Sequence, residues 1–98
     1  MEIEYRDKRL ALIPTDRAAE TRLPVSVIKS LREKLIVISA APDERTLRNW
    51  KSLHYEQLKG DRADQRSIRL NNQFRLVLQV DDSHSPPKAI LLGVEDYH

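Results

Sequence analysis

The chain has 98 residues, enough for one domain with a single hydrophobic core of modest size, and we expect that domain to span residues 1–98. It contains no cysteine, which excludes disulfide bonds, thiol catalysis and cysteine-ligated metal sites and favours a reducing cytoplasm. A net charge of +2 with 33% charged residues makes it mildly basic. No apolar run approaches the roughly 18 residues of a membrane span, so we expect a cytoplasmic protein without membrane contact.

The N-terminal half predicts a short strand and two helices. Ile3 and Tyr5 alternate as in a strand, and the polar residues 14–21 indicate a loop. A helix follows Pro24, since apolar residues recur there at helical spacing, namely Val27, Ile28, Leu31, Leu35 and Ile38. Pro42 ends this helix, because the residue before a proline disfavours helical geometry. Asp43 is a suitable N-cap for a second, short helix through Leu47 and Trp50.

The C-terminal half predicts strands. The pattern changes to strand from Ser52 onward and leads to a turn at Gly60, after which residues 66–80 predict a hairpin. The final run, 89–94, is apolar on both faces and therefore indicates a strand inside the sheet. We expect an α+β fold with two N-terminal helices packed on a small, mostly antiparallel twisted sheet.

Alternation of side chains sets the register of the hairpin. The apolar residues occupy one face of each strand: Ile68 and Leu70 on the first, and Phe74, Leu76, Leu78 and Val80 on the second. Both sets face the core if Leu70 pairs with Phe74 around a three-residue loop that begins with two asparagines. The same register pairs Arg69 with Arg75 on the opposite face. A two-residue loop would mix core and solvent positions, and we reject it.

Two arginines that face each other destabilise a sheet, by up to about 1 kcal/mol. A pair of this kind is suited to hold an anion between its guanidinium groups, because the guanidinium fork matches phosphate and carboxylate. An equally open interpretation is that Arg69 and Arg75 are solvated and that each has an acidic neighbour.

Several kinds of site are not indicated. The three histidines lie far apart in the sequence without a metal-ligand spacing, the two glycines form no phosphate-binding loop, and the helix pair is not placed to read DNA as a helix-turn-helix. We expect no metal and no cofactor. Trp50 is expected in the core or between helices, and His54 and Tyr55 are expected to pack against or cap a strand.

A cationic and acid-base set remains, made of Lys59, Arg62, Arg66, Arg69, Arg75, Tyr97 and His98. RNA transphosphorylation uses such a set, because the attacking 2′-hydroxyl needs a base, the leaving 5′-oxygen needs an acid, and the phosphorane needs cations. His98 is the natural proton carrier, and Tyr97 could orient it or stack on a base. The alternative is that residues 97–98 are only a frayed tail.

The segment from Leu58 to Leu78, with Leu58–Lys59–Gly60, Ser67–Ile68–Arg69 and Gln73–Phe74–Arg75, resembles the HigB branch of the RelE/ParE toxin superfamily, as does the Glu–Asp–Tyr–His ending. The resemblance implies a RelE-like domain that acts as a ribosome-dependent endoribonuclease on translated mRNA. It also implies silencing by a cognate antitoxin, in this branch usually a HigA-like helix-turn-helix protein.

The resemblance also assigns site residues. Lys59, Arg69 and Arg75 would hold the scissile phosphate and stabilise its charge, and Tyr97 and His98 would serve in proton transfer and base contact. Arg62 and Arg66 are expected to bind RNA. Two other functions remain open: a ParE-like toxin that inhibits gyrase by binding, and a non-catalytic module that binds RNA or protein.

Overall fold

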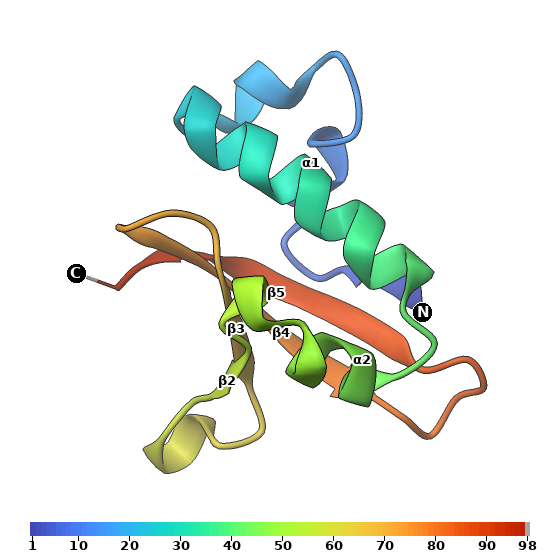
Figure 1. Cartoon of the computed structure of the whole chain (residues 1–98). Coiled ribbons are helices and arrows are strands. Elements are labelled where there is room, and N and C mark those ends of the chain that lie inside the picture. Colours follow the sequence, from blue (N-terminus) through green and yellow to red (C-terminus); the bar gives the residue numbers. More distant parts are fainter. Residues whose placement is uncertain (98) are drawn as a thin grey trace.

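A five-stranded mixed sheet forms the centre of the computed structural model, which describes residues 1–97 (Figure 1). Its strand order is β1-β5-β4-β3-β2. The bounds are Glu2–Tyr5 for β1, Glu56–Gln57 for β2, Arg66–Arg69 for β3, Phe74–Asp81 for β4 and Lys88–Asp96 for β5. β1 runs parallel to β5 and the other neighbours are antiparallel. The expected mostly antiparallel sheet is confirmed, and β5 lies inside it as its apolar faces indicated.

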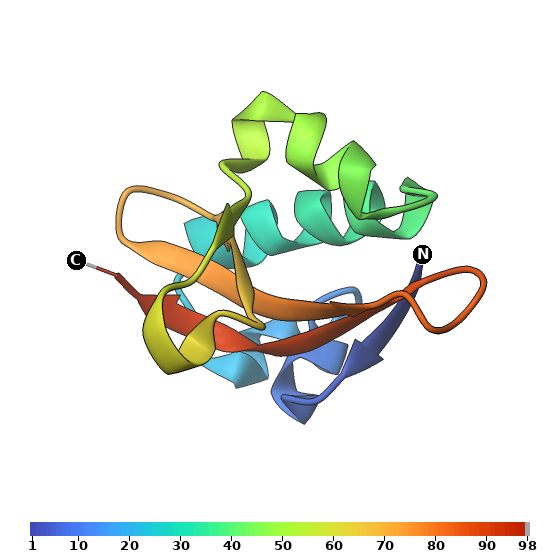
Figure 2. The same cartoon turned by 90° about the horizontal axis from the view of Figure 1, so that it is seen from below.

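Two helices cover one face of this sheet, α1 (Val25–Ala40) and α2 (Glu44–Asn49), as Figure 2 shows. α1 begins directly after Pro24 and ends before Pro42, at the boundaries that the two prolines predicted. Asp43 caps α2, since its carboxylate accepts a hydrogen bond of 3.1 Å from the Thr46 backbone N–H. The α+β arrangement of the sequence analysis is therefore confirmed.

Short 3₁₀ turns occur where the sequence predicted a loop, at 14–21, and the start of a strand, at Ser52. The polar segment 14–21 contains such a turn at Ala18–Thr21, in which Ala18 and Thr21 are buried. The strand expected from Ser52 is wrong at its start, because Lys51–Leu53 form a 3₁₀ turn and β2 spans only Glu56–Gln57. Leu53 is fully buried, so the apolar side chains that resembled a strand pattern instead anchor a turn against the core.

The core lies between the helices and the sheet. Among its fully buried side chains are Leu31 and Ile38 of α1, Leu47 of α2 and Ile68, Leu76 and Leu91 of the sheet. Trp50 is 47% exposed, so the prediction that it packs in the core is wrong. No helix in residues 1–97 is both long enough and apolar enough to cross a bilayer.

Candidate functional site

The β3–β4 hairpin has the register that alternation predicted. Arg69 pairs with Arg75 and Ile68 pairs with Leu76. Leu70 donates its backbone N–H to the Phe74 carbonyl at 2.9 Å. The side chain of Asn71 closes the loop, because its Oδ1 accepts from the backbone N–H groups of Gln73 and Phe74 at 2.8 and 2.7 Å. Local hydrogen bonds thus fix the loop that sets the two arginines opposite each other.

β5 adds a carboxylate beside the arginine pair. Its Glu95 lies opposite Arg75 across β4 and β5, so Arg69, Arg75 and Glu95 form one row over three strands. Glu95 Oε1 lies 3.2 Å from Arg75 Nη2. Arg75 therefore has the acidic neighbour that the second interpretation required. Arg69 is exposed and forms no ion pair with any residue in 1–97.

Arg62 reaches the same carboxylate from the turn before β3. Its Nη1 and Nη2 donate to Glu95 Oε1 and Oε2 at 3.2 and 2.5 Å, a bidentate pair, and its Nε donates to Gln65 Oε1 at 3.0 Å. The hydrogen bonds from Arg62, followed by the one from Arg75, hold the pKa of Glu95 below its ordinary value. Glu95 is consequently ionised at neutral pH and neutralises part of the charge of both arginines.

A small cavity of about 50 Å³ lies beside the arginine pair, lined by His54, Glu56, Ser67, Arg69, Arg75 and Tyr97. His54 adopts a left-handed backbone conformation with φ 48°, directly after the 3₁₀ turn, and its side chain is exposed. The packing expected of His54 is therefore wrong, whereas Tyr55 is partly buried and packs against the core. Sequence periodicity gave no sign that His54 would line a cavity, because Leu53 and Tyr55 on either side of it alternate as in a strand.

Tyr97 is fixed at the rim of this cavity. Its backbone N–H donates to the Gln73 carbonyl at 3.0 Å, and its hydroxyl donates to the Asn71 carbonyl at 2.6 Å. The guanidinium carbon of Arg75 lies 5.9 Å from the centre of the Tyr97 ring, within the range of a cation–π contact. Tyr97 therefore lies at the cavity beside the arginine pair, whereas His98, the other predicted residue of the C-terminal end, lies outside the described residues.

Lys59 lies on the other side of Arg75. It lines a wider hollow of about 310 Å³ together with Glu56, Gln57, Leu58, Arg62 and Arg75. Arg75 and Glu56 line both cavities. The structure thus brings Lys59, Arg62, Arg69, Arg75 and Tyr97 to one continuous surface.

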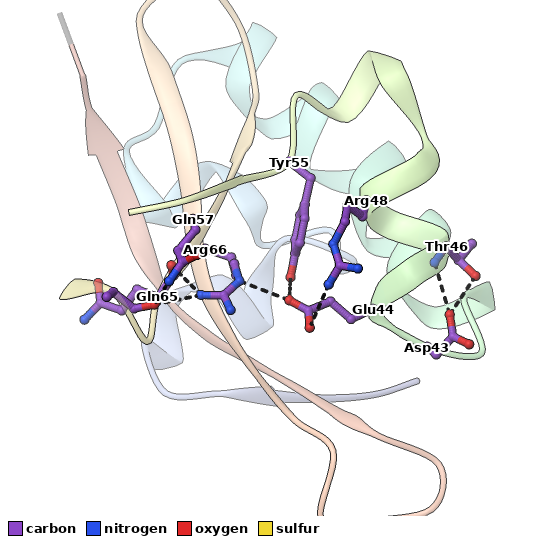
Figure 3. Close-up of polar contacts among 9 residues, drawn as sticks. Asp43, Glu44, Thr46, Arg48, Tyr55, Gln57, Gln65 and Arg66 are labelled. Carbon is purple, nitrogen blue, oxygen red and sulfur yellow. Dashed lines mark hydrogen bonds and ion pairs between the residues drawn. The ribbon is translucent and has the colours of Figure 1, made fainter. Parts of the chain in front are cut away.

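Arg66 is not part of that surface, because its position in β3 places it on the opposite face from Ser67. Its Nε donates to Glu44 Oε2 of α2 at 3.1 Å, and the same oxygen accepts the Tyr55 hydroxyl at 2.8 Å (Figure 3). Burial, followed by the hydrogen bond to Glu44, raises the pKa of Tyr55. Arg66 and Tyr55 therefore fasten β3 and the segment before β2 to α2.

A family model of HigB-like toxins, described as the RelE-like toxin of the type II toxin-antitoxin system HigB, matches residues 3–88. The chain belongs to this family. It is also 34% identical over 82 residues to Toxin HigB-1 of Vibrio cholerae serotype O1 (strain ATCC 39315 / El Tor Inaba N16961), covering 84% of this chain and 86% of that protein.

Solved structures agree with the fold of this HigB-like toxin. A YoeB/ParE toxin from Agrobacterium tumefaciens superposes with a TM-score of 0.58 at 17% identity, covering all of both chains. A YoeB dimer from Staphylococcus aureus gives 0.54 at 23% identity, over 100% of this chain and 97% of that one. At these identities the likeness shows the RelE-like fold alone.

Proposed function

We propose that this RelE-like toxin is a ribosome-dependent endoribonuclease that cleaves translated mRNA by metal-independent transphosphorylation. The observation that carries the proposal is the cavity in which opposed arginines, Arg69 and Arg75, meet a histidine and a tyrosine. Family membership supports it as well. Cations, a proton carrier and an aromatic ring are the groups that cleavage of an RNA strand at a bound phosphate requires.

The nucleophile and the leaving group of the proposed reaction both belong to the RNA, and the protein supplies the base, the acid and the cations. The ribose 2′-oxygen attacks the adjacent phosphorus and loses its proton to a base. The bond from phosphorus to the 5′-oxygen then breaks, and an acid donates a proton to that oxygen. The products are a 2′,3′-cyclic phosphate and a 5′-hydroxyl. Between attack and departure of the 5′-oxygen, negative charge accumulates on the non-bridging oxygens of the phosphorane, and guanidinium groups stabilise it.

Each residue at the cavity has a proposed part in this reaction. Arg69, Arg75 and Lys59 hold the phosphate and stabilise its developing charge. His54 is the histidine that the structure places in the cavity, and it carries a proton there. Tyr97 contacts a base, since its ring is held in place by the bond from its hydroxyl to Asn71. His98, the next residue in the sequence, is the proposed second proton carrier. Arg62 binds RNA outside the cavity.

The partners follow from the same proposal. The mRNA is cut on the ribosome, and a cognate antitoxin of the HigA-like helix-turn-helix type binds the toxin and silences it. The proposed location is the cytoplasm, because translated mRNA is found there.

The test is induction of the toxin in bacteria, followed within minutes by measurement of protein synthesis and mapping of new 5′ ends in transcripts. Wild type should arrest translation and create cuts within translated reading frames. Arg69→Ala and His54→Ala should each remove the cuts, because they take away a phosphate contact and a proton carrier. Arg45→Ala, which removes an exposed arginine of α2 away from the cavity, is the matched control and should cut like wild type.

Two results would overturn the proposal. Cuts that persist in both cavity variants would show that the arginine pair is not the reaction site. Intact transcripts together with an early arrest of DNA replication would favour the ParE-like function, in which the same fold inhibits gyrase by binding.

A further inference from the structure

Glu95 occupies the position on Arg62 and Arg75 that a phosphate group would take. Its two oxygens meet both Nη atoms of Arg62, and one of them also meets Arg75. Guanidinium groups bind the non-bridging oxygens of a phosphate in the same forked manner. Within residues 1–97 this carboxylate is the only one at ion-pair distance from either arginine, although Asp61 also acts on Arg62 from further away.

The surroundings of this ion pair suit an RNA strand. Lys59 lines the same hollow of about 310 Å³ and is exposed. Arg75 lines both this hollow and the smaller cavity that contains Arg69. Two phosphates next to each other in one strand could therefore contact Arg75 from its two sides, one near Arg69 and one near Arg62.

The ion pair is open to exchange. The side chains of Arg62 and Glu95 are 37% and 38% exposed, and an ion pair with that much access to water adds little stability. Arg75 is more enclosed, at 25%, and its Nε–H is buried without a hydrogen-bond partner in residues 1–97. Separation of Arg62 and Glu95 therefore costs little stability, whereas Arg75 is less accessible to water.

We propose that Glu95 fills a second phosphate subsite, formed by Lys59, Arg62 and Arg75, and that an RNA strand displaces it with the phosphate next to the scissile one. This inference rests on the proposed function, because it takes RNA as the ligand. Glu95 is then an internal competitor of RNA, which lowers the affinity of the free protein for RNA that is not presented to it on the ribosome.

The test measures binding of a short fluorescein-labelled, single-stranded RNA by fluorescence anisotropy. All its riboses are 2′-O-methylated, so that it cannot be cleaved. Glu95→Gln keeps the shape of the side chain and removes the charge, and it should tighten binding about fivefold, the effect of removing one like charge about 4 Å away in water. Glu56→Gln is the matched control. Glu56 lines both cavities and forms no ion pair in the described chain, so its substitution should tighten binding less.

A double-mutant cycle separates competition from a general charge effect. Arg62→Ala should weaken binding more in the Glu95→Gln background than in wild type, because Glu95 masks Arg62 only in wild type. Glu56→Gln should leave the effect of Arg62→Ala unchanged. Far-UV circular dichroism checks that each variant is folded.

Opposite results would overturn the inference. Glu95→Gln that weakens binding, or that acts no more strongly than Glu56→Gln, would mean that Glu95 only orients the arginines. RNA binding by Arg69→Ala then shows whether only this inference fails or the proposed function fails with it. If Arg69→Ala weakens binding while the Glu95 results are negative, only the exchange is wrong; if Arg69→Ala leaves binding unchanged, this face does not bind RNA and both proposals fail.

Discussion

The hydrogen bond from Tyr55 to Glu44 gives a direct test of how the segment that carries His54 is held. Tyr55→Phe removes one hydroxyl and leaves the ring in place. Glu44 Oε2 then loses its 2.8 Å bond from Tyr55 and keeps the 3.1 Å bond from Arg66 Nε. The substitution therefore isolates a single contact between α2 and the residue that follows His54 (Figure 3).

The expected loss is about 1.5–2 kcal/mol in the free energy of unfolding. Hydrogen bonds to charged groups contribute about 1.5–3 kcal/mol. The Glu44 side chain is 26% exposed, so water replaces part of what the hydroxyl supplied, and the lower part of that range applies. In a domain of about this size each 1 kcal/mol lowers the melting temperature by about 4–8 °C.

Urea unfolding followed by far-UV circular dichroism measures this loss. Tyr5→Phe is the matched control, because Tyr5 is also partly buried and its hydroxyl makes no hydrogen bond within residues 1–97. The control should change stability by less than about 0.5 kcal/mol. Equal effects of the two substitutions would refute the reasoning, since the bond to Glu44 would then contribute nothing.

Three further predictions follow from charges and caps. Burial raises the pKa of Tyr55, so its contribution to stability is complete below pH 10.0, the ordinary pKa, and is lost as the pH rises above it; Tyr55→Phe should flatten the alkaline side of a stability profile. Arg62 lowers the pKa of Glu95, so that contribution is present above pH 4.5 and is lost as the pH falls below it; Glu95→Gln should make acid unfolding less steep, as measured by circular dichroism from pH 7 to pH 2. Asp43→Ala removes the N-cap of α2 and should cost about 1 kcal/mol in urea unfolding, whereas Asp16→Ala, an exposed control, should not.

The sequence determined the helix ends and the strand register wherever residues only a few positions apart decide them. The prolines before and after α1 fixed its ends, and Asp43 marked the start of α2. Alternation fixed the register of β3 against β4, because a shift of one residue would turn Ile68 and Leu76 to the solvent. The opposition of Arg69 and Arg75 could therefore be predicted from the sequence alone.

Turns with left-handed or 3₁₀ backbone were not predictable in the same way. Leu53 and Tyr55 alternate as in a strand, yet His54 between them has φ 48°. Tertiary packing decides the backbone there, since Leu53 is buried in the core and Tyr55 reaches Glu44 of α2. A histidine assigned to packing consequently lines the cavity instead.

The surroundings of the arginines depended on contacts between residues far apart in the chain. The sequence grouped the five basic residues in and before the hairpin, namely Lys59, Arg62, Arg66, Arg69 and Arg75. It could not show on which face of the sheet each one lies or which carboxylate each one contacts. The place of β5 beside β4 brings Glu95 to Arg75 and within reach of Arg62, 33 positions earlier. The packing of α2 brings Glu44 to Arg66 on the opposite face. Sequence thus determined which cations are present and which two of them oppose each other, and only the tertiary structure decided which carboxylate each one meets, because strand order and helix packing are non-local.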